Sequence, residues 1–308
     1  MKSNPLPLCV CGSSDFTRTE VDILLRNSDV EYGTAKCSNC GSFFLNPMPN
    51  ADAISRHYSN DYNFYQGNNP KQYGRGVGFG LHYLAPRKSS GVLLDVGCGA
   101  SDFLKAIHDT VHWSVAGCDI NGESIENAKI ATGLDTLYHG DIFDPRLSEF
   151  LYDCIHLRDV IEHVTEPLNF LRRARDLLAD DGFAYVRIPN GPVEFRGKSR
   201  EAKRTGKAVL TTPGHLWYVS SNGFSKLCER AGLDIELGFS FGLKNGLRNL
   251  GWYPVPRTSR IMKVRPSSDR EWFSGSEKAS KRFLRQERAL WKGVSAFHLE
   301  HVYLLRKR

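Results

Sequence analysis

The feature that most constrains the fold is a short apolar run at residues 92–96, which ends in the turn Gly97-Cys98-Gly99. Glycines bound this run on both sides, as is typical of a buried parallel strand. From Ser101 onward the apolar residues have helical spacing. Glycines at such a turn let the backbone approach a ligand closely, and the N-terminus of the helix offers unpaired N–H groups. We therefore predict a strand–turn–helix unit that binds a ligand.

The same alternation of strand and helix continues along the chain. Apolar runs predict further strands at residues 115–120, 136–139, 154–157, 183–188, 234–239 and 301–305. Helical spacing predicts helices at 123–131, from Pro167 to a closing Gly182, and around 224–231. Strands that alternate with helices form a parallel sheet with helices on both faces. The predicted fold class is therefore α/β, with a doubly wound, mostly parallel, Rossmann-like sheet.

The pattern divides the chain into three regions. Residues 1–48 form a zinc-ribbon-like module, residues 49–90 a connector of helix and loop, and residues 91–308 the α/β domain. Within the connector, the glycine-rich passage 74–80 is typical of a flexible loop or hinge. Residues 243–297 interrupt the last strands with several prolines and a basic helix near 277–292. An insertion of this length is commonly a lid or a substrate-side cap.

Four of the eight cysteines form two close pairs in the first region, namely Cys9, Cys11, Cys37 and Cys40. A glycine follows each pair and permits the turn that aims backbone N–H groups at sulfur. Four thiolates suit tetrahedral zinc, although the single-residue spacer of the first pair is tighter than usual. No fifth polar ligand is evident, so we expect a structural zinc. The alternative is four free thiols.

The formal net charge of +7 is unevenly spread. Residues 196–308 hold 24 Lys and Arg against 9 Asp and Glu, so this third is basic and the rest is acidic. A basic face suits an anionic partner, or it is simply a solvated helix surface. No apolar run approaches the roughly 20 residues of a membrane span, and the N-terminus lacks the apolar core of a signal peptide. We expect a soluble, cytoplasmic protein, whose oligomeric state the sequence does not indicate.

Acidic residues follow the next two strands. Asp119 ends the second strand about 24 residues after Asp95, where a carboxylate can accept both hydroxyls of a ribose. Asp141 follows the third strand and could pair with an adenine amino group, while Ile142 covers the ring. Asp102 stands where a dinucleotide site would place its third glycine, and a carboxylate disfavours a diphosphate. Each aspartate alone could be a helix cap or turn former, but their order at successive strand ends favours a nucleoside ligand.

These stretches resemble the class I S-adenosylmethionine-dependent methyltransferases, in the branch with ubiquinone-pathway O-methyltransferases and many small-molecule and sugar methyltransferases. The resemblance spans about residues 93–233 and includes Leu94-Asp-Val-Gly-Cys-Gly99, Tyr152-Asp-Cys-Ile-His-Leu-Arg-Asp-Val-Ile-Glu-His163 and Gly214-His-Leu-Trp-Tyr218. It implies S-adenosylmethionine as the cofactor, with contacts assigned to Asp95, Gly97, Cys98, Gly99, Asp119, Ile120, Asp141, Ile142 and Arg158. Ser101 departs from the family, which often has a third glycine there. Zinc-ribbon leaders of this kind also precede the domain in sugar C-methyltransferases.

Asp159, Glu162 and His163 follow the fourth strand at spacings that would share one face of a helix. They could supply a general base or a divalent-cation site. In the resembling ubiquinone-pathway enzymes, an acidic–acidic–His group at these positions is linked to a metal. The alternative is that His163 packs under the donor site and the carboxylates cap the helix. His215 could orient or deprotonate the acceptor, or could bond a backbone carbonyl as a structural histidine. These four residues are our catalytic candidates.

The predicted activity is methyl transfer from S-adenosylmethionine to an oxygen or carbon of a small-molecule acceptor. The basic cap would suit a phosphorylated acceptor, such as a nucleotide-linked sugar or a glycan precursor. Nucleic-acid methylation is an alternative suggested by the basic third, but the Asn/Asp-Pro-Pro-Tyr/Phe motif is absent after the fourth strand. A zinc-ribbon binding protein with a catalytically silent domain is another alternative, and the intact donor motif argues against it.

Overall fold

The computed structural model describes residues 8–25, 30–50, 53–54, 69–206, 208–210, 214–242, 247, 281 and 299–308. Apart from two single residues, the insertion expected at 243–297 and its basic helix lie outside the described residues. Among the helices that are described, none has the length and apolar character needed to cross a membrane. The three region boundaries stay a prediction.

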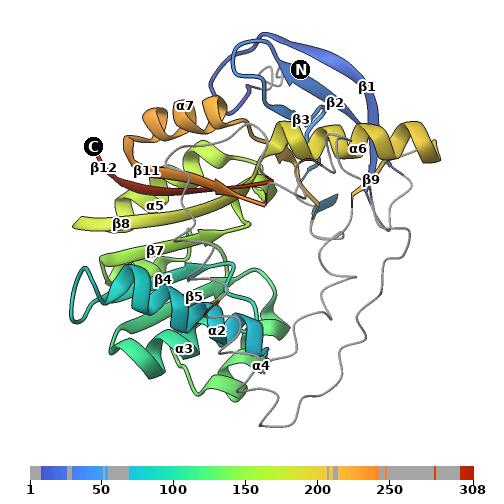
Figure 1. The fold of residues 1–308 in the computed structure, drawn as a ribbon. Coiled ribbons are helices and arrows are strands. Elements are labelled where there is room, and N and C mark those ends of the chain that lie inside the picture. The colour runs from blue at the N-terminus through green and yellow to red at the C-terminus, as the bar shows by residue number, and fades with distance from the viewer. Residues whose placement is uncertain are drawn as a thin grey trace.

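The larger of two sheets has seven strands in the order β11-β12-β8-β7-β4-β5-β6 (Figure 1). The pairings that join β4 to β5 and β7, β5 to β6 and β7 to β8 are parallel, and β12 runs antiparallel to both β8 and β11. This confirms the predicted doubly wound, mostly parallel sheet. The strands are β4 (Val92–Val96), β5 (Ser114–Asp119), β6 (Leu137–His139), β7 (Tyr152–Arg158), β8 (Leu178–Pro189), β11 (Leu233–Phe241) and β12 (Glu300–Lys307).

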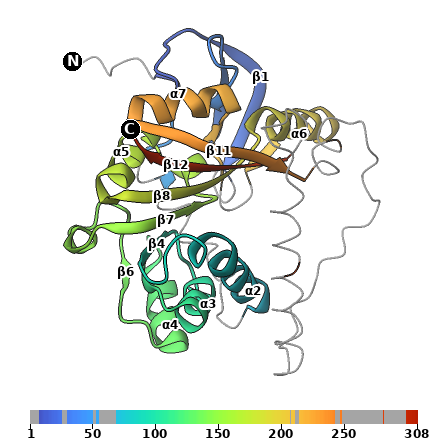
Figure 2. The ribbon, with the colours of Figure 1, turned by 60° about the vertical axis from the view of Figure 1, so that its left-hand side comes forward.

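Helices cover both faces of this sheet, and each face has its own buried cluster of apolar side chains. One face carries α2 (Pro70–Phe79), α3 (Asp102–Val111) and α4 (Gly122–Thr132). The other carries α5 (Pro167–Leu177) and α7 (Ser221–Ala231), as Figure 2 shows from the side. The short helical turns are η1 (Gly80–Leu84), η2 (Pro145–Glu149) and η3 (Ile161–His163).

The glycine-rich passage 74–80 is helical, so the expectation of a flexible loop or hinge is wrong. It forms the second half of α2 and continues into η1. A methyl group on Gly76 would clash with the carbonyl oxygen of Phe103 on α3 and would lie 2.7 Å from Cβ of Ala106. The glycine thus lets two helix backbones touch, which any side chain would prevent.

The helix predicted to close at Gly182 ends earlier. α5 stops at Leu177, and Leu178 begins β8, where it pairs with Tyr152 of β7. Gly182 lies inside that strand, and a methyl group there would come 2.8 Å from the carbonyl oxygen of Tyr152. Leu178 fits both the helical spacing and the start of a strand, so periodicity alone places the boundary too late.

A second, five-stranded sheet has the order β10-β3-β2-β1-β9. Its strands β1 (Phe16–Leu25), β2 (Glu31–Cys37) and β3 (Phe43–Leu45) belong to what we call the four-cysteine module, described residues 8–25 and 30–50. The other two, β9 (Ala208–Leu210) and β10 (Trp217–Tyr218), come from an excursion of the chain between α6 (Gly191–Thr205) and α7. The module lies beside α6 and α7 (Figures 1 and 2), and its buried side chains join the cluster on the α5 and α7 face.

Candidate functional site

The turn after β4 has three residues in the left-handed backbone region, at φ of 76° for Gly97, 51° for Gly99 and 60° for Ser101. The N–H groups of Gly97 and Cys98 donate to the carbonyl of Cys118 on β5, at 2.8 and 3.1 Å. The Cys98 side chain is buried, and burial raises the pKa of its thiol. The turn therefore offers backbone rather than side chains to a ligand at the carboxyl edge of the sheet.

Both predicted aspartates lie at that same edge. Asp119 ends β5 and accepts hydrogen bonds from the backbone N–H groups of Gly99 and Asn121, each at 2.9 Å. Its carboxyl is buried, and burial raises the pKa of Asp119. Asp141, after β6, is exposed and accepts from the N–H of Phe143 at 2.9 Å. The two carboxyl groups therefore follow β5 and β6 at the sheet edge that carries the glycine turn.

The apolar residues expected beside these carboxylates differ in exposure. Ile120 is 51% exposed, whereas Ile142 is 0% exposed and belongs to the core cluster. The side chain of Ile142 therefore presents no surface to a ligand. Phe143, the next residue, is 51% exposed. Phe143 was not among the predicted contacts, although an aromatic residue two positions after a loop aspartate was a signal.

Asp95 lies under the turn with a partner that the sequence analysis did not single out. Its Oδ1 is 2.7 Å from Nδ1 of His156, which is opposite Asp95 in the β4–β7 register. The imidazole lies stacked against Phe103, at 4.4 Å between ring centroids, and against Tyr185, at 5.2 Å. Only the strand register reveals this pair, because 61 residues separate its members.

Arg158 and Asp159 belong to a network of charges at the ends of β7 and β8. Nη1 of Arg158 donates to Oε1 of Gln72 on α2 at 3.4 Å, and Nη2 forms an ion pair with Asp159 at 3.2 Å. Arg187 forms ion pairs with Asp159 at 3.7 Å and with Glu300 at 3.1 Å. Burial would raise the pKa of Asp159, but the nearby cationic groups, with Arg187 and Arg158 foremost, outweigh it and lower this pKa. Asp159 thus has guanidinium groups as its ion-pair partners.

The other three catalytic candidates lie together. The rings of His163 and His215 are 4.7 Å apart, and Oε1 of Glu162 is 3.9 Å from Nε2 of each. Nδ1 of His163 is 2.9 Å from the carbonyl oxygen of Gly214. Because a carbonyl only accepts, Nδ1 carries the proton, and Nε2 is the basic nitrogen of the neutral ring. Nδ1 of His215 forms an ion pair at 2.7 Å with Glu194 on α6.

The helix face proposed for Asp159, Glu162 and His163 does not form. The three-residue turn η3 starts at Ile161, and Asp159 has a φ of 55°, outside helical geometry. His215 replaces Asp159 as the neighbour of the other two. Sequence spacing grouped Asp159 with Glu162 and His163. It could not indicate His215, because His215 comes close to these two residues only in the tertiary fold.

The protonation states of this cluster are unusual. Burial raises the pKa of Glu162 to about 8, so its carboxyl is neutral at pH 7. Burial would lower the pKa of His215, but the charge of Glu194 outweighs it and raises the pKa to about 9. A neutral carboxyl and an imidazolium therefore coexist at neutral pH. Such shifts, caused by burial and by a specific charged partner, are typical of functional sites.

Several buried polar atoms in this cluster lack hydrogen-bond partners. Among the described residues, they include both carboxylate oxygens of Glu162, Oε2 of Glu194 and the hydroxyl of Tyr218. Buried polar atoms nearly always have a partner, so a group of exceptions indicates a bound ligand, water or ion. Neither Glu194, which lies in a mostly basic helix, nor the hydroxyl of Tyr218 was predicted from the sequence.

The cluster adjoins the glycine turn. A methyl group on Gly97 would lie 3.1 Å from Cγ2 of Val160, so the start of the 160–163 segment touches the turn. The N–H of His163 donates to the carbonyl of Val160 at 2.9 Å. The N–H of Leu216 donates to the carbonyl of Glu162 at 2.8 Å, which holds the segment with His215 against η3. The segment that carries Glu162 and His163 is therefore packed directly against the glycine turn.

Glu162, His163 and His215 also have the geometry of a cation site. Each offers one ligand atom, and the three atoms lie within 4.8 Å of one another. Two imidazoles and one carboxylate are a common ligand set for divalent transition metals. The cation site predicted from sequence included Asp159, which the structure instead pairs with Arg158 and Arg187.

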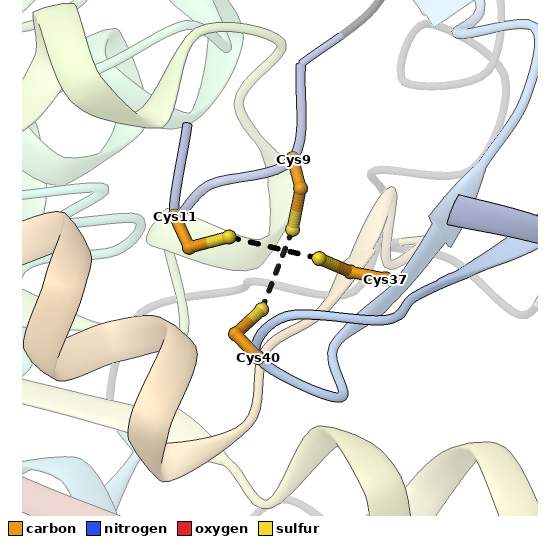
Figure 3. A group of neighbouring side chains, drawn as sticks. All are labelled: Cys9, Cys11, Cys37 and Cys40. Carbon is orange, nitrogen blue, oxygen red and sulfur yellow. Dashed lines mark hydrogen bonds between the residues drawn. The ribbon is translucent and has the colours of Figure 1, made fainter. Parts of the chain in front are cut away.

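The four paired cysteines point toward one centre (Figure 3). Sγ of Cys9 is 3.5 Å from Sγ of Cys40, and Sγ of Cys11 is 3.6 Å from Sγ of Cys37. Four sulfurs at a zinc–sulfur distance of about 2.3 Å stand about 3.8 Å apart in a tetrahedron. The cluster therefore has the size and chemistry of a tetrahedral zinc site.

A family model described as a methyltransferase domain matches residues 69–237, more than half of the chain. The curated ubiquinone biosynthesis O-methyltransferase of Neisseria meningitidis serogroup C is 23% identical over 152 residues, which are 46% of this chain and 63% of that protein. The chain thus spans less than two thirds of the length of this relative. The four-cysteine module precedes the residues that the family model matches.

Two solved structures show the level of similarity to known folds. A TehB-like SAM-dependent methyltransferase from Corynebacterium glutamicum is 16% identical with a TM-score of 0.43, over 76% of this chain and 88% of that one. The plantazolicin methyltransferase BpumL, solved in complex with SAH, is 18% identical with a TM-score of 0.47, over 84% of this chain and 92% of that one.

Proposed function

The chain belongs to the methyltransferase-domain family, and from this premise we propose that it transfers a methyl group from S-adenosylmethionine to an oxygen or carbon of a small-molecule acceptor. The matched residues include the glycine turn, Asp119 and both candidate histidines. One observation carries the acceptor side of the proposal. It is the group of buried, partnerless polar atoms of Glu162, Glu194 and Tyr218 beside these histidines.

In this proposal the donor lies along the carboxyl edge of β4, β5 and β6. The backbone of Gly97 and Gly99 permits its close approach, and the carboxylate of Asp119 accepts the ribose hydroxyls. Asp141 accepts from the adenine amino group, with Ile120 and Phe143 as apolar surfaces for the ring. Asp95 and Arg158 are assigned to the charged methionine end of the donor.

On the acceptor side, Nε2 of His163 takes the proton of the attacking group. The acceptor oxygen or carbon forms a bond to the methyl carbon while the bond between that carbon and sulfur breaks. The electron pair of the broken bond stays on sulfur. The imidazolium of His215, held by Glu194, donates a hydrogen bond that orients the acceptor. The donor is intrinsically reactive, so the protein contributes mainly position and a base.

We infer from this cluster that the acceptor is rich in hydroxyl groups. Within the described part of the chain, both oxygens of Glu162, Oε2 of Glu194 and the Tyr218 hydroxyl lack a hydrogen-bonding partner. Sugar hydroxyls both donate and accept, so they can satisfy all of these atoms. A phosphate next to Glu194 would be repelled. If the acceptor is nucleotide-linked, its phosphates would therefore bind away from the histidine pair.

We also propose that Cys9, Cys11, Cys37 and Cys40 hold one structural zinc. The spacing of the four sulfurs supports this assignment. Elemental analysis of the purified chain should find about one zinc per chain, and Cys37→Ser should lose it. A folded wild-type chain without metal would refute the assignment.

A divalent cation bound by Glu162, His163 and His215 is a second candidate. Nδ1 of each imidazole faces an oxygen, of Gly214 or of Glu194, as metal-binding histidines commonly do. Titration of Mn²⁺ into the zinc-loaded chain distinguishes a cation site at these three residues from His163 acting as a base without a cation. Binding in the wild type that disappears in Glu162→Gln supports the cation site, whereas absence of binding leaves His163 as the base.

The activity is tested by a screen with methyl-labelled donor against nucleotide sugars, glycan precursors, phenols and nucleic acid. We expect label in a hydroxyl-bearing small molecule, and we expect His163→Ala to lower the rate by about 100-fold or more with unchanged donor affinity. Label in nucleic acid alone, or donor binding without transfer to any class, would overturn the proposed acceptor class.

A further inference from the structure

The four-cysteine module and the histidine pair are joined by paired strands. Residue 40 ends the second cysteine pair, and β3 begins three residues later. β3 pairs antiparallel with β10, with Phe44 opposite Trp217. The N–H of Leu45 donates to the carbonyl of Leu216 at 3.0 Å, one residue after His215. The backbone next to His215 is therefore held directly by the backbone that follows the cysteine cluster.

The opposite side of the same segment is held by the η3 region. The N–H of Leu216 donates to the carbonyl of Glu162 at 2.8 Å, and Nε1 of Trp217 donates to the carbonyl of Val164 at 2.8 Å. Trp217 is 5% exposed, and its ring packs on Phe44 at 5.3 Å. Residues 214–217 thus lie between β3 of the module and the turn that carries His163.

A second bridge starts at the cysteine cluster itself. The Oγ of Ser42 accepts from the backbone N–H of Ser220 at 3.0 Å and lies 3.2 Å from Sγ of Cys40. The hydroxyl of Ser220 donates to the carbonyl of Cys40 at 2.6 Å. Ser42 is 0% exposed, so water does not compete for these bonds. The position of Cys40 therefore constrains the position of Ser220, just after β10.

We propose that metal bound by the four cysteines positions His215, so that the module is a positioning element of the acceptor site. Because Cys37 ends β2 and Cys40 leads into β3, closure of the cluster fixes the turn between these strands. Metal-binding free energy at such a site becomes free energy of local folding. This inference rests on the proposed role of His215, but its structural part is independent of methyl transfer.

The donor site provides the contrast. The hydrogen bonds that order Asp119 come from Gly99 and Asn121, and the turn is held by Cys118, all within the β4–β5 region. The α2, α3 and α4 face also has its own buried cluster. Loss of metal should therefore disturb the acceptor side and leave donor affinity unchanged.

The test compares zinc-loaded and zinc-stripped full-length chain by three measurements. Hydrogen exchange reports the Leu216 amide, long-range ¹⁵N spectra report the imidazole of His215, and calorimetry reports affinity for S-adenosylhomocysteine. We expect exchange at Leu216 to accelerate by about tenfold or more and the His215 signals to move, with donor affinity within about twofold. Unchanged exchange, or donor affinity lost together with protection, overturns the proposal.

A matched pair of serine variants tests the bridge without removing a cysteine. Ser42→Ala removes the buried hydroxyl between Cys40 and Ser220, whereas Ser38→Ala removes an exposed hydroxyl from the same turn. In zinc-loaded protein we expect Ser42→Ala to accelerate exchange at Leu216 and to move the His215 signals. Ser38→Ala should match the wild type. If the two variants show the same exchange at Leu216 and the same His215 signals, the cysteine cluster does not position residue 215 through Ser42, and the proposal is overturned.

Discussion

At the scale of single residues, two non-glycine residues hold left-handed backbone conformations at the carboxyl edge of the sheet. They are Ser101, at a φ of 60°, and Asp159, at 55°. For L-residues this conformation costs roughly 1–2 kcal/mol. Such strain persists where the surrounding structure fixes it, and it is often found at functional sites. Both residues flank the proposed donor site.

Replacing Ser101 by glycine should stabilise the protein by about 1 kcal/mol, because glycine adopts this φ without strain. Urea denaturation gives the change in the free energy of unfolding. Ser114→Gly is a control in an ordinary strand position, and it should destabilise by about 0.5–1 kcal/mol. A loss of stability in Ser101→Gly would show that the hydroxyl matters more than the backbone strain.

The His215–Glu194 pair makes a pH prediction. The raised pKa of His215, about 9, means that its cation persists through neutral pH and is lost as the pH rises through 9. The stabilisation from the pair should be complete below pH 6.5 and should disappear through pH 9. The rate of methyl transfer should fall over the same alkaline range, and Glu194→Gln should shift this fall to lower pH. Identical alkaline limbs in both proteins would contradict the assignment.

The sequence located part of the site and missed part of it. Glu162 and His163 follow a buried strand, and His215 stands in a recognisable loop, so their motifs could be found. Glu194 on α6 and Tyr218 on β10 reach the cluster only through the tertiary fold, in which β10 pairs with β3. No periodicity or spacing in the sequence indicates that these residues lie close together.

At the scale of elements, the central strands were predictable because parallel strands buried on both faces are continuous apolar runs. The passage 74–80 was misread because its glycines serve a helix–helix contact, and the sequence does not show the partner helix. The end of α5 was misread because Leu178 suits either element. Local composition therefore fails where packing decides between two structures.

Gly76→Ala tests the α2 contact. The added methyl has no room beside Phe103 and Ala106, so we expect a loss of about 1–3 kcal/mol in stability. Since α2 also carries Gln72, which contacts Arg158, affinity for the donor should fall too. Lys71→Ala, at an exposed site of the same helix, should change neither quantity. An unaffected Gly76→Ala variant would show that α2 moves away at little cost.

At the scale of the whole molecule, the two sheets are not independent. The four-cysteine module supplies three strands of the smaller sheet, and the chain between α6 and α7 supplies the other two. Its buried side chains continue into the cluster on the α5 and α7 face. The excess of Lys and Arg in the last third of the chain could be counted from the sequence. Most of the basic insertion at residues 243–297 lies outside the described residues. The union of the two sheets could not be predicted, because β9 and β10 are only three and two residues long.

Calorimetric titration of S-adenosylmethionine into the full chain tests the central claim most directly. We expect saturable binding in the wild type, the same affinity in the exposed control Asp135→Ala, and affinity at least about 30-fold lower in Asp119→Asn. The expected loss follows from weaker acceptance of the ribose hydroxyls, because hydrogen bonds to a charged group are each worth about 1.5–3 kcal/mol. A wild-type chain that does not bind the donor, or an Asp119→Asn variant that binds it equally well, would contradict this account.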